Sequence, residues 1–198
     1  MILSTATDPE LVARAAAGSE AAYRELLDRY QRPVFSLVYR MVRDREEAED
    51  LAQETFVRVF NNIGRYDSQW KFSSWIFKIA NNLGIDTLRR RKLKTVSIDG
   101  APDALTADET EASSIQLASE DPDPEERLEA VELGDEIEQA IGELRPEYRT
   151  AILLRHVEGR PYEEIAQIME IPLGTVKTYI HRARGELREA LEHLRCES

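Results

Sequence analysis

The chain has 198 residues and a net charge of −12, is 42% hydrophobic and 7% aromatic, and contains a single cysteine. This length allows one large domain or two small ones with ordinary cores. No run approaches the roughly 18 apolar residues of a membrane span, the N-terminus does not resemble a signal peptide, and one cysteine cannot form an internal disulfide. We therefore expect a cytoplasmic protein.

Residues that carry common catalytic chemistry are scarce. The three histidines, His156, His181 and His193, do not fall into a cluster with metal-ligand spacing. A glycine-rich phosphate loop, a GxSxG motif and a closely spaced carboxylate pair are also absent. The sequence therefore predicts no metal site and no cofactor, and it argues against an enzyme.

Helical periodicity begins close to the N-terminus. Asp8 and Pro9 predict the start of a short helix that Gly18 ends, and Ser19 can cap the next helix. Beyond Pro33, apolar residues spaced three and four apart form one stripe: Val34, Leu37, Val38, Met41 and Val42.

Two further helices follow in the N-terminal half. The first stops at Gly64, and its apolar positions are Ala48, Leu51, Ala52, Phe56, Val59 and Ile63. After the loop GRYDSQWKFSS, the second covers about 74–91 and carries Trp75, Ile76, Ile79, Leu83 and Leu88. No alternating pattern of useful length predicts a β-strand.

The composition changes sharply after this helix. Residues 96–126 contain ten acidic residues, three prolines and no lysine or arginine. Such a charge imbalance with few large apolar residues is typical of a flexible linker. A linker of this length spans roughly 30 Å on average and about 100 Å when fully extended.

The remainder predicts a second group of helices, from about 127 to 144, from 146 to 156, over PYEEIAQIM, and from about Pro172. Four short helices with tight connections are typical of a helix-turn-helix domain. We therefore expect an all-α protein with helical domains over 8–94 and 127–195, joined by an acidic flexible linker over 95–126.

The last predicted helix has two distinct faces. Val176 and Ile180 are spaced to anchor it inward, whereas Lys177, Thr178, His181 and Arg182 share the other face and Arg184 follows. A helix in the major groove of DNA needs such a face, since Arg and Lys can read guanine or bind phosphate. Alternatively, the same cations are a solvated face favoured by the dipole at the end of the helix.

Two long stretches resemble the extracytoplasmic-function sigma factors of bacterial RNA polymerase. LRPEYRTAILLRHVEGRPYEEIAQIMEIPLGTVKTYIHRARGELREAL (144–191) is similar to their region 4, and YRMVRDREEAEDLAQETFVRVFNNIGRYDSQWKFSSWIFKIANNLGIDTLRRRK (39–92) is similar to their region 2. Both occur in the family's order on either side of a linker. This combination is far more specific than a lone helix-turn-helix.

The resemblance implies that region 4 recognises the −35 promoter element. The matching DNA-binding positions are Gly174, Thr175, Lys177, Thr178, His181, Arg182 and Arg184. Two positions depart from the family pattern. Pro161 stands where a Ser or Thr helix cap is common, at a cost of about 1 kcal/mol, and Glu170 stands in a turn that favours Gly or Asn, at roughly 1–2 kcal/mol if left-handed.

The resemblance also implies that region 2 docks on the clamp helices of the polymerase β′ subunit. In DLAQE, the polar residues Asp50, Gln53 and Glu54 lie beside the apolar stripe and match this docking surface. Without the resemblance, the same residues would be read as an ordinary exposed helix face.

Residues 65–94 carry a net charge of +6, with aromatic residues among the first cations. Cations combined with aromatic and amide side chains are typical of single-strand binding. The resemblance implies that the loop 65–74 accepts a base flipped from the −10 element. The −10 set is Arg65, Lys71, Trp75, Lys78, Asn82, Arg89 and Arg90. The alternative to DNA binding for Trp75 and Phe77 is a place in the hydrophobic core, and we expect this of at least one of them.

The implied function is promoter recognition for bacterial RNA polymerase, in a stress or envelope response and without catalysis by this chain. The implied partners are the polymerase core, through its β′ clamp helices and β flap, promoter DNA, and an anti-sigma factor that can hold the chain at the membrane; no small-molecule substrate is implied. Two alternatives are a helix-turn-helix regulator that binds duplex DNA without polymerase, and a protein-binding adaptor without DNA contact.

Overall fold

The computed structural model describes residues 6–97 and 124–192, and every regular element in these ranges is helical. We call residues 6–97 the N-terminal unit and residues 124–192 the C-terminal unit. The first contains α1 (Asp8–Ala16), α2 (Glu20–Val42), α3 (Arg45–Asn61), the 3₁₀ turn η1 (Ile63–Arg65) and α4 (Phe72–Ser97). The second contains α5 (Pro124–Glu143), α6 (Pro146–Ile152), the π-helical turn η2 (Leu153–Val157), α7 (Tyr162–Met169) and α8 (Leu173–Ala190).

The helix boundaries follow local chemistry. Ser19 caps α2 by accepting a hydrogen bond from the Ala22 backbone N–H, as predicted, and Asp44 caps α3 by accepting from the Glu47 N–H at 2.8 Å. Between α1 and α2 the chain turns at Gly18, whose φ of +90° is rarely adopted by residues with a side chain.

Two helices extend beyond their predicted limits. Helix α4 continues through 95–97 and α5 already includes 124–126, so the predicted linker is helical at both ends. The rest of the predicted linker, 98–123, lies outside the described residues.

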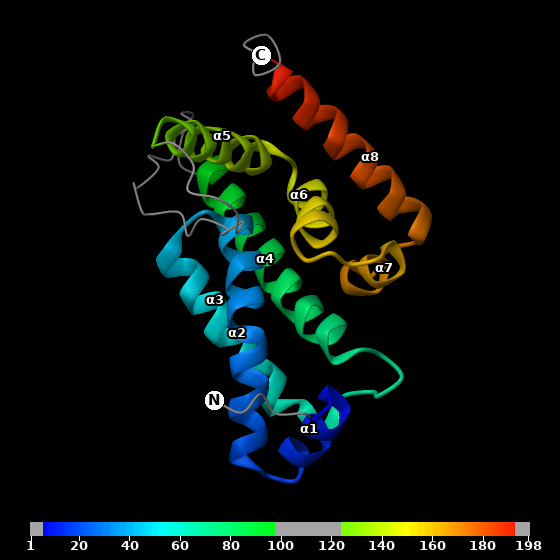
Figure 1. Ribbon diagram of the computed structural model, residues 1–198. Coiled ribbons are helices and arrows are strands. Elements are labelled where there is room, and N and C mark those ends of the chain that lie inside the picture. Colours follow the sequence, from blue (N-terminus) through cyan, green and yellow to red (C-terminus); the bar gives the residue numbers. More distant parts are fainter. Residues whose placement is uncertain (1–5, 98–123, 193–198) are drawn as a thin grey trace.

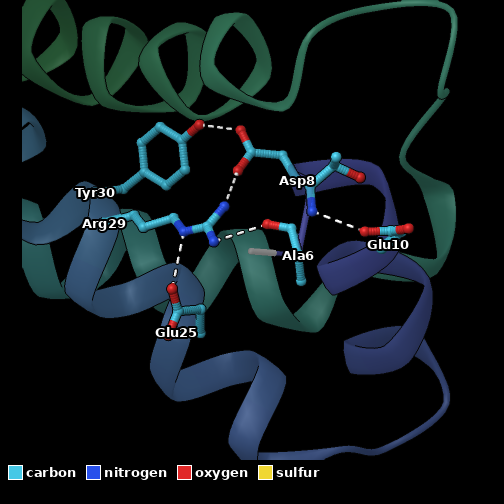
Figure 2. Close-up of polar contacts among 7 residues, drawn as sticks. Ala6, Asp8, Glu10, Glu25, Arg29 and Tyr30 are labelled. Carbon is cyan, nitrogen blue, oxygen red and sulfur yellow. Dashed lines mark hydrogen bonds and ion pairs between the residues drawn. The ribbon is translucent and has the colours of Figure 1, made fainter. Parts of the chain in front are cut away.

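A network of hydrogen bonds and ion pairs joins α1 and the residue before it to α2 (Figure 2). The Arg29 guanidinium donates to the Asp8 carboxylate at 2.9 Å, to the Ala6 carbonyl at 2.8 Å and to Glu25 at 3.0 Å. The Tyr30 hydroxyl donates to the same Asp8 carboxylate. Burial, together with this carboxylate, raises the pKa of the Tyr30 phenol, so that it stays protonated and acts as a donor at neutral pH.

The core of the N-terminal unit lies among α2, α3 and α4. The predicted stripe on α2 is confirmed, since Val34, Leu37, Val38, Met41 and Val42 are all buried. Helices α2 and α4 pack against each other at Gly84, where a Cβ would lie 2.6 Å from the Met41 Cε. Phe77 is fully buried, which confirms that at least one of Trp75 and Phe77 is a core residue.

The two units pack against each other (Figure 1), and their buried apolar residues form one continuous cluster. Helix α7 lies beside the first turns of α4, and α6 also contacts α2 and α4. A buried guanidinium crosses this boundary: Arg149 of α6 donates to the carbonyls of Met41, at the end of α2, and of Gly142 and Leu144, at the end of α5.

Candidate nucleic-acid and polymerase interfaces

Helix α8 presents the predicted −35 residues on one side of the C-terminal unit. Its inward side chains are Val176, Ile180 and Ala183, which are buried, and the first two confirm the predicted anchors. Thr175 is half-buried, and the exposed members of the predicted set are Gly174, Lys177, Thr178, His181, Arg182 and Arg184. A Cβ at Gly174 would meet no atom within 4 Å, so the first turn of the helix is open to a ligand.

Two of these cations are held by residues from α6 and η2. Arg182 donates to the Tyr148 hydroxyl at 3.1 Å, and this hydrogen bond raises the pKa of Arg182. The Arg184 guanidinium lies 3.1 Å from the His156 Nε2. Burial, with Arg184 and Arg155 nearby, lowers the pKa of His156, so that its ring is neutral at pH 7 and can accept this hydrogen bond.

Tyr148 and His156 were missed by the sequence analysis. They lie 34 and 28 positions from their partners Arg182 and Arg184, so no helical spacing connects them. The aromatic contact between Tyr148 and Tyr179, with ring centroids 5.2 Å apart, further ties α6 to α8. The two arginines are therefore oriented before any ligand binds.

The two departures from the family pattern lie at the two ends of α7. Pro161 is the N-cap residue of α7 and provides no side-chain cap, whereas Glu163 and Glu164 lie in the first turn, where acidic residues are favourable. Glu170 ends α7 with φ 56° and ψ 41°, so the position is left-handed, as was considered from the sequence.

The predicted polymerase-docking residues lie together on the outer face of α3. Asp50, Gln53 and Glu54 are exposed, and Glu54 forms an ion pair with Arg58 at 2.7 Å. On the inner face of the helix, Leu51 and Phe56 are buried. The apolar face thus fixes the orientation of the helix, and the polar residues remain available on its other side.

The aromatic residues of the loop before α4 and of the first turn of α4 fall into two groups. Trp75 is half-buried against Tyr66 and Phe72, with ring centroids 5.4 and 5.9 Å away, whereas Trp70 is 49% exposed. The Tyr66 hydroxyl donates to the Trp70 carbonyl and braces the loop. Trp70 is therefore the more exposed of the two tryptophans, and the −10 role of Trp75 stays a prediction.

The remaining predicted −10 residues are not equally free. Arg65, Asn82, Arg89 and Arg90 are exposed, although Arg90 also donates to Thr87 at 3.3 Å. Lys71 and Lys78 form ion pairs with Glu164 and Glu170 of the C-terminal unit, the second at 2.8 Å. The structure thus brings part of the predicted set into contact with the other half of the chain.

In the described ranges, 6–97 and 124–192, no group of three or more His, Cys, Asp or Glu side chains could hold a metal ion. No helix in the same ranges combines the length and apolar character that crossing a membrane requires.

The chain is similar to sigma factors along most of its length. Residues 26–94 match the family model of sigma-70 region 2, and residues 134–187 match that of sigma-70 region 4. The ECF RNA polymerase sigma factor SigW of Bacillus subtilis is 39% identical over 179 residues, which cover 89% of this chain and 92% of SigW. The RNA polymerase sigma-H factor of Pseudomonas aeruginosa is 34% identical and covers 98% of both chains.

Two solved structures share the fold. CnrH, in complex with the cytosolic domain of CnrY, has a TM-score of 0.67 and 22% identity, and the match covers 94% of this chain and 97% of CnrH. The sigma factor RpoE of Bartonella quintana, in complex with the anti-sigma factor NepR, has a TM-score of 0.65 and 22% identity over 86% and 96% of the two chains.

Proposed function

The chain belongs to the extracytoplasmic-function sigma factors of bacterial RNA polymerase, and from this premise we propose which of its surfaces meets each partner. As a sigma factor it directs the polymerase core to promoters for the initiation of transcription. We propose that the polymerase supplies all the chemistry and that this chain contributes binding and positioning alone. The protein acts in the cytoplasm, where the polymerase core and promoter DNA are found.

Helix α8 is the proposed −35 reader. The observation that carries this assignment is the exposed face of Lys177, Thr178, His181 and Arg182, opposite the buried Val176. A helix anchored in this way can enter the major groove and place three or four side chains against base edges. The hydrogen bond from Arg182 to Tyr148 supports a role that needs a defined orientation, such as reading guanine.

The loop between η1 and α4, together with the exposed side of α4, is the proposed −10 surface. Single-strand capture requires an aromatic platform for an unstacked base and cations for the backbone. Trp70 supplies an exposed ring, Asn82 an exposed amide, and Arg65, Arg89 and Arg90 supply exposed cations. Trp75 then has an indirect role: its ring packs against Tyr66, and Tyr66 holds the loop through its hydrogen bond to the Trp70 carbonyl.

The exposed acidic and amide residues of α3, Asp50, Gln53 and Glu54, are the proposed contact with the β′ clamp helices. The C-terminal unit is proposed to contact the β flap. An anti-sigma factor is the proposed inhibitor in trans, since the RpoE structure with the same fold is a complex with the anti-sigma factor NepR. The three domains are proposed to cover 8–94, 95–126 and 127–195.

A gel shift with labelled promoter DNA tests this function, with and without core polymerase. A few phosphate contacts on one small unit give weak affinity, so the free protein should bind promoter duplex poorly. Holoenzyme should bind it specifically because the polymerase tethers both units to one promoter and raises their effective concentration. Tight, sequence-specific binding by the free chain, unchanged by core polymerase, would instead support a self-sufficient regulator.

A further inference from the structure

The two arginines on the proposed −35 face are held by neutral groups. Arg182 donates through Nη1 to the Tyr148 hydroxyl at 3.1 Å, and the Arg184 Nη2 lies 3.1 Å from the Nε2 of His156, whose ring is neutral at pH 7. Arginines on other helices, such as Arg58 of α3, pair with carboxylates. A neutral acceptor fixes a guanidinium without cancelling its charge, so both arginines of α8 keep their attraction for DNA.

Tyr148 is a well-fixed point of the C-terminal unit. It is only 6% exposed, and its ring contacts that of Tyr179 on α8 with centroids 5.2 Å apart. The Arg145 guanidinium lies over the same ring, 6.0 Å from its centroid. Because its neighbours hold the ring, the hydroxyl can serve as an anchor for a longer and more mobile side chain.

The hydrogen bond leaves a recognition edge of Arg182 free. A guanidinium carries five N–H donors, and Tyr148 accepts from Nη1 alone. The edge formed by Nε and Nη2 can then donate two parallel hydrogen bonds, as arginine does when it reads O6 and N7 of guanine. Arg182 is exposed, so a ligand in contact with α8 can reach this edge.

An arginine without an anchor has more than one use on DNA. Its long side chain can turn from a base edge to a neighbouring phosphate, a contact that gives affinity but carries no sequence information. Fixing one nitrogen before DNA binds removes many of these conformations and lowers the cost of ordering the side chain for the base contact. Such an anchor therefore affects the choice between base and phosphate more than the total attraction.

We propose that Tyr148 is a specificity-determining positioning residue of the −35 reader, because it directs the Nε–Nη2 edge of Arg182 to a guanine. Recognition of the −35 element is then shared between α8, which enters the groove, and α6, which packs against it (Figure 1). The inference rests on the proposed function, since it assumes that α8 reads the −35 duplex.

The test is the base preference of holoenzyme on a promoter fragment whose −35 element is randomised. Bound fragments are sequenced for wild type, for Arg182→Ala and for Tyr148→Phe, which removes the hydroxyl and keeps the ring. At the position where Arg182→Ala loses a guanine preference, Tyr148→Phe should reduce that preference roughly three- to tenfold, the effect of one hydrogen bond. Preferences at the other positions, and binding to fragments with the poorest −35 elements, should stay unchanged.

Two controls separate positioning from a general effect on the fold. Tyr39→Phe removes the hydroxyl of an exposed tyrosine on α2 and should give the wild-type profile. In the Arg182→Ala background, Tyr148→Phe should have no further effect, because the side chain that the hydroxyl positions is gone. A loss of structure would instead lower binding in both backgrounds.

The possible failures are distinguishable. If Arg182→Ala removes the preference at one position and Tyr148→Phe leaves it at the wild-type level, Tyr148 does not position Arg182, and α8 remains the −35 reader. An equal loss at all positions with Tyr148→Phe, in both backgrounds, would make its role structural and would also overturn the proposal. If Arg182→Ala changes no base preference, Arg182 reads no base, and the positioning role of Tyr148 falls with it.

Discussion

The cations of α8 lie on a protein whose net charge of −12 should repel DNA. Electrostatic attraction at a contact surface is local, because exposed charges are screened beyond roughly 8 Å at physiological salt. Acidic residues elsewhere therefore do not cancel the attraction between Lys177 or Arg182 and a phosphate in contact. They do suppress long-range steering and non-specific binding, which favours a protein that finds DNA only together with its polymerase.

A substitution of the single residue Arg182 tests whether α8 reads the −35 sequence. If it reads a base, Arg182→Ala should cost about 1–3 kcal/mol of discrimination between the correct −35 sequence and a mismatched one. Holoenzyme titrations against both sequences measure this difference. Arg188→Ala, an exposed arginine farther along the same helix, is the matched control and should leave discrimination unchanged. Equal weakening on all sequences, with a salt slope reduced by about one, would make Arg182 a phosphate contact instead.

Helix α3 has a buried face that packs in the hydrophobic core of the N-terminal unit and an exposed face that is the proposed contact with polymerase. Its inward residues, among them Leu51 and Phe56, belong to the core, so the exposed Asp50 and Gln53 are held in a fixed orientation. A polar surface on a rigid helix is suited to docking, because little conformational freedom is lost on binding. The same rigidity allows the surface residues to be changed without loss of the fold.

The double variant Asp50→Ala with Gln53→Ala should weaken assembly with core polymerase and leave the free energy of unfolding within about 0.5 kcal/mol of wild type. The chain offers a matched control on α2, where Asp28 and Gln31 are exposed with the same spacing. Asp28→Ala with Gln31→Ala should bind core normally. Affinities follow from a titration of labelled protein with core, and unchanged affinity of the α3 variant would remove the docking assignment.

The loop before α4 combines a braced backbone with an exposed aromatic ring. Trp70→Ala should reduce open-complex formation, because stacking of a base on an aromatic side chain contributes about 1–3 kcal/mol. Asn82→Ala should alter the −10 preference, and neither change should affect −35 binding. Permanganate footprints and a set of −10 mutants provide the readouts. Asn61→Ala, an exposed asparagine on α3, is the control, and wild-type footprints from both test variants would refute the single-strand assignment.

At the scale of the whole molecule, Arg149 joins the two units. Its side chain is nearly buried, and its guanidinium donates to carbonyls at the ends of α2 and α5 rather than to an acid. Burial, with Arg43 nearby, lowers the pKa of Arg149 to about 10, so the group remains charged at neutral pH. It can thus neutralise the negative ends of two helix dipoles at once.

Arg149→Met should lower the free energy of unfolding by about 1–3 kcal/mol, because buried carbonyls lose their donor. Urea denaturation followed by circular dichroism measures the loss. The exposed neighbour Arg145 serves as a comparison, and Arg145→Met should stay within about 0.5 kcal/mol of wild type. A similar effect of both variants would show that Arg149 contributes no more than a surface arginine.

The predicted linker allows both closed and extended arrangements. With its helical ends excluded, the linker keeps 26 residues, 98–123, whose extended reach of about 90 Å still exceeds the roughly 70 Å of two helical turns of DNA. Units that pack together in the free protein can therefore also lie on two separate promoter elements. Within the units, the hydrophobic periodicity alone predicted the order of the helices, the inward stripe of α2 and the two faces of α8, because these features depend on residues a few positions apart.

Contacts between distant parts of the chain could not be predicted from the sequence, because hydrophobic periodicity relates only residues a few positions apart. Nothing in the sequence pairs Lys71 with Glu164 or Arg182 with Tyr148, since these partners are 93 and 34 positions apart. Likewise, composition could not tell that Trp70 is more exposed than Trp75, because the Trp75 ring packs against Tyr66 and Phe72 in the folded protein. Local spacing determined the elements and their faces, and tertiary packing decided which polar side chains remain free to bind.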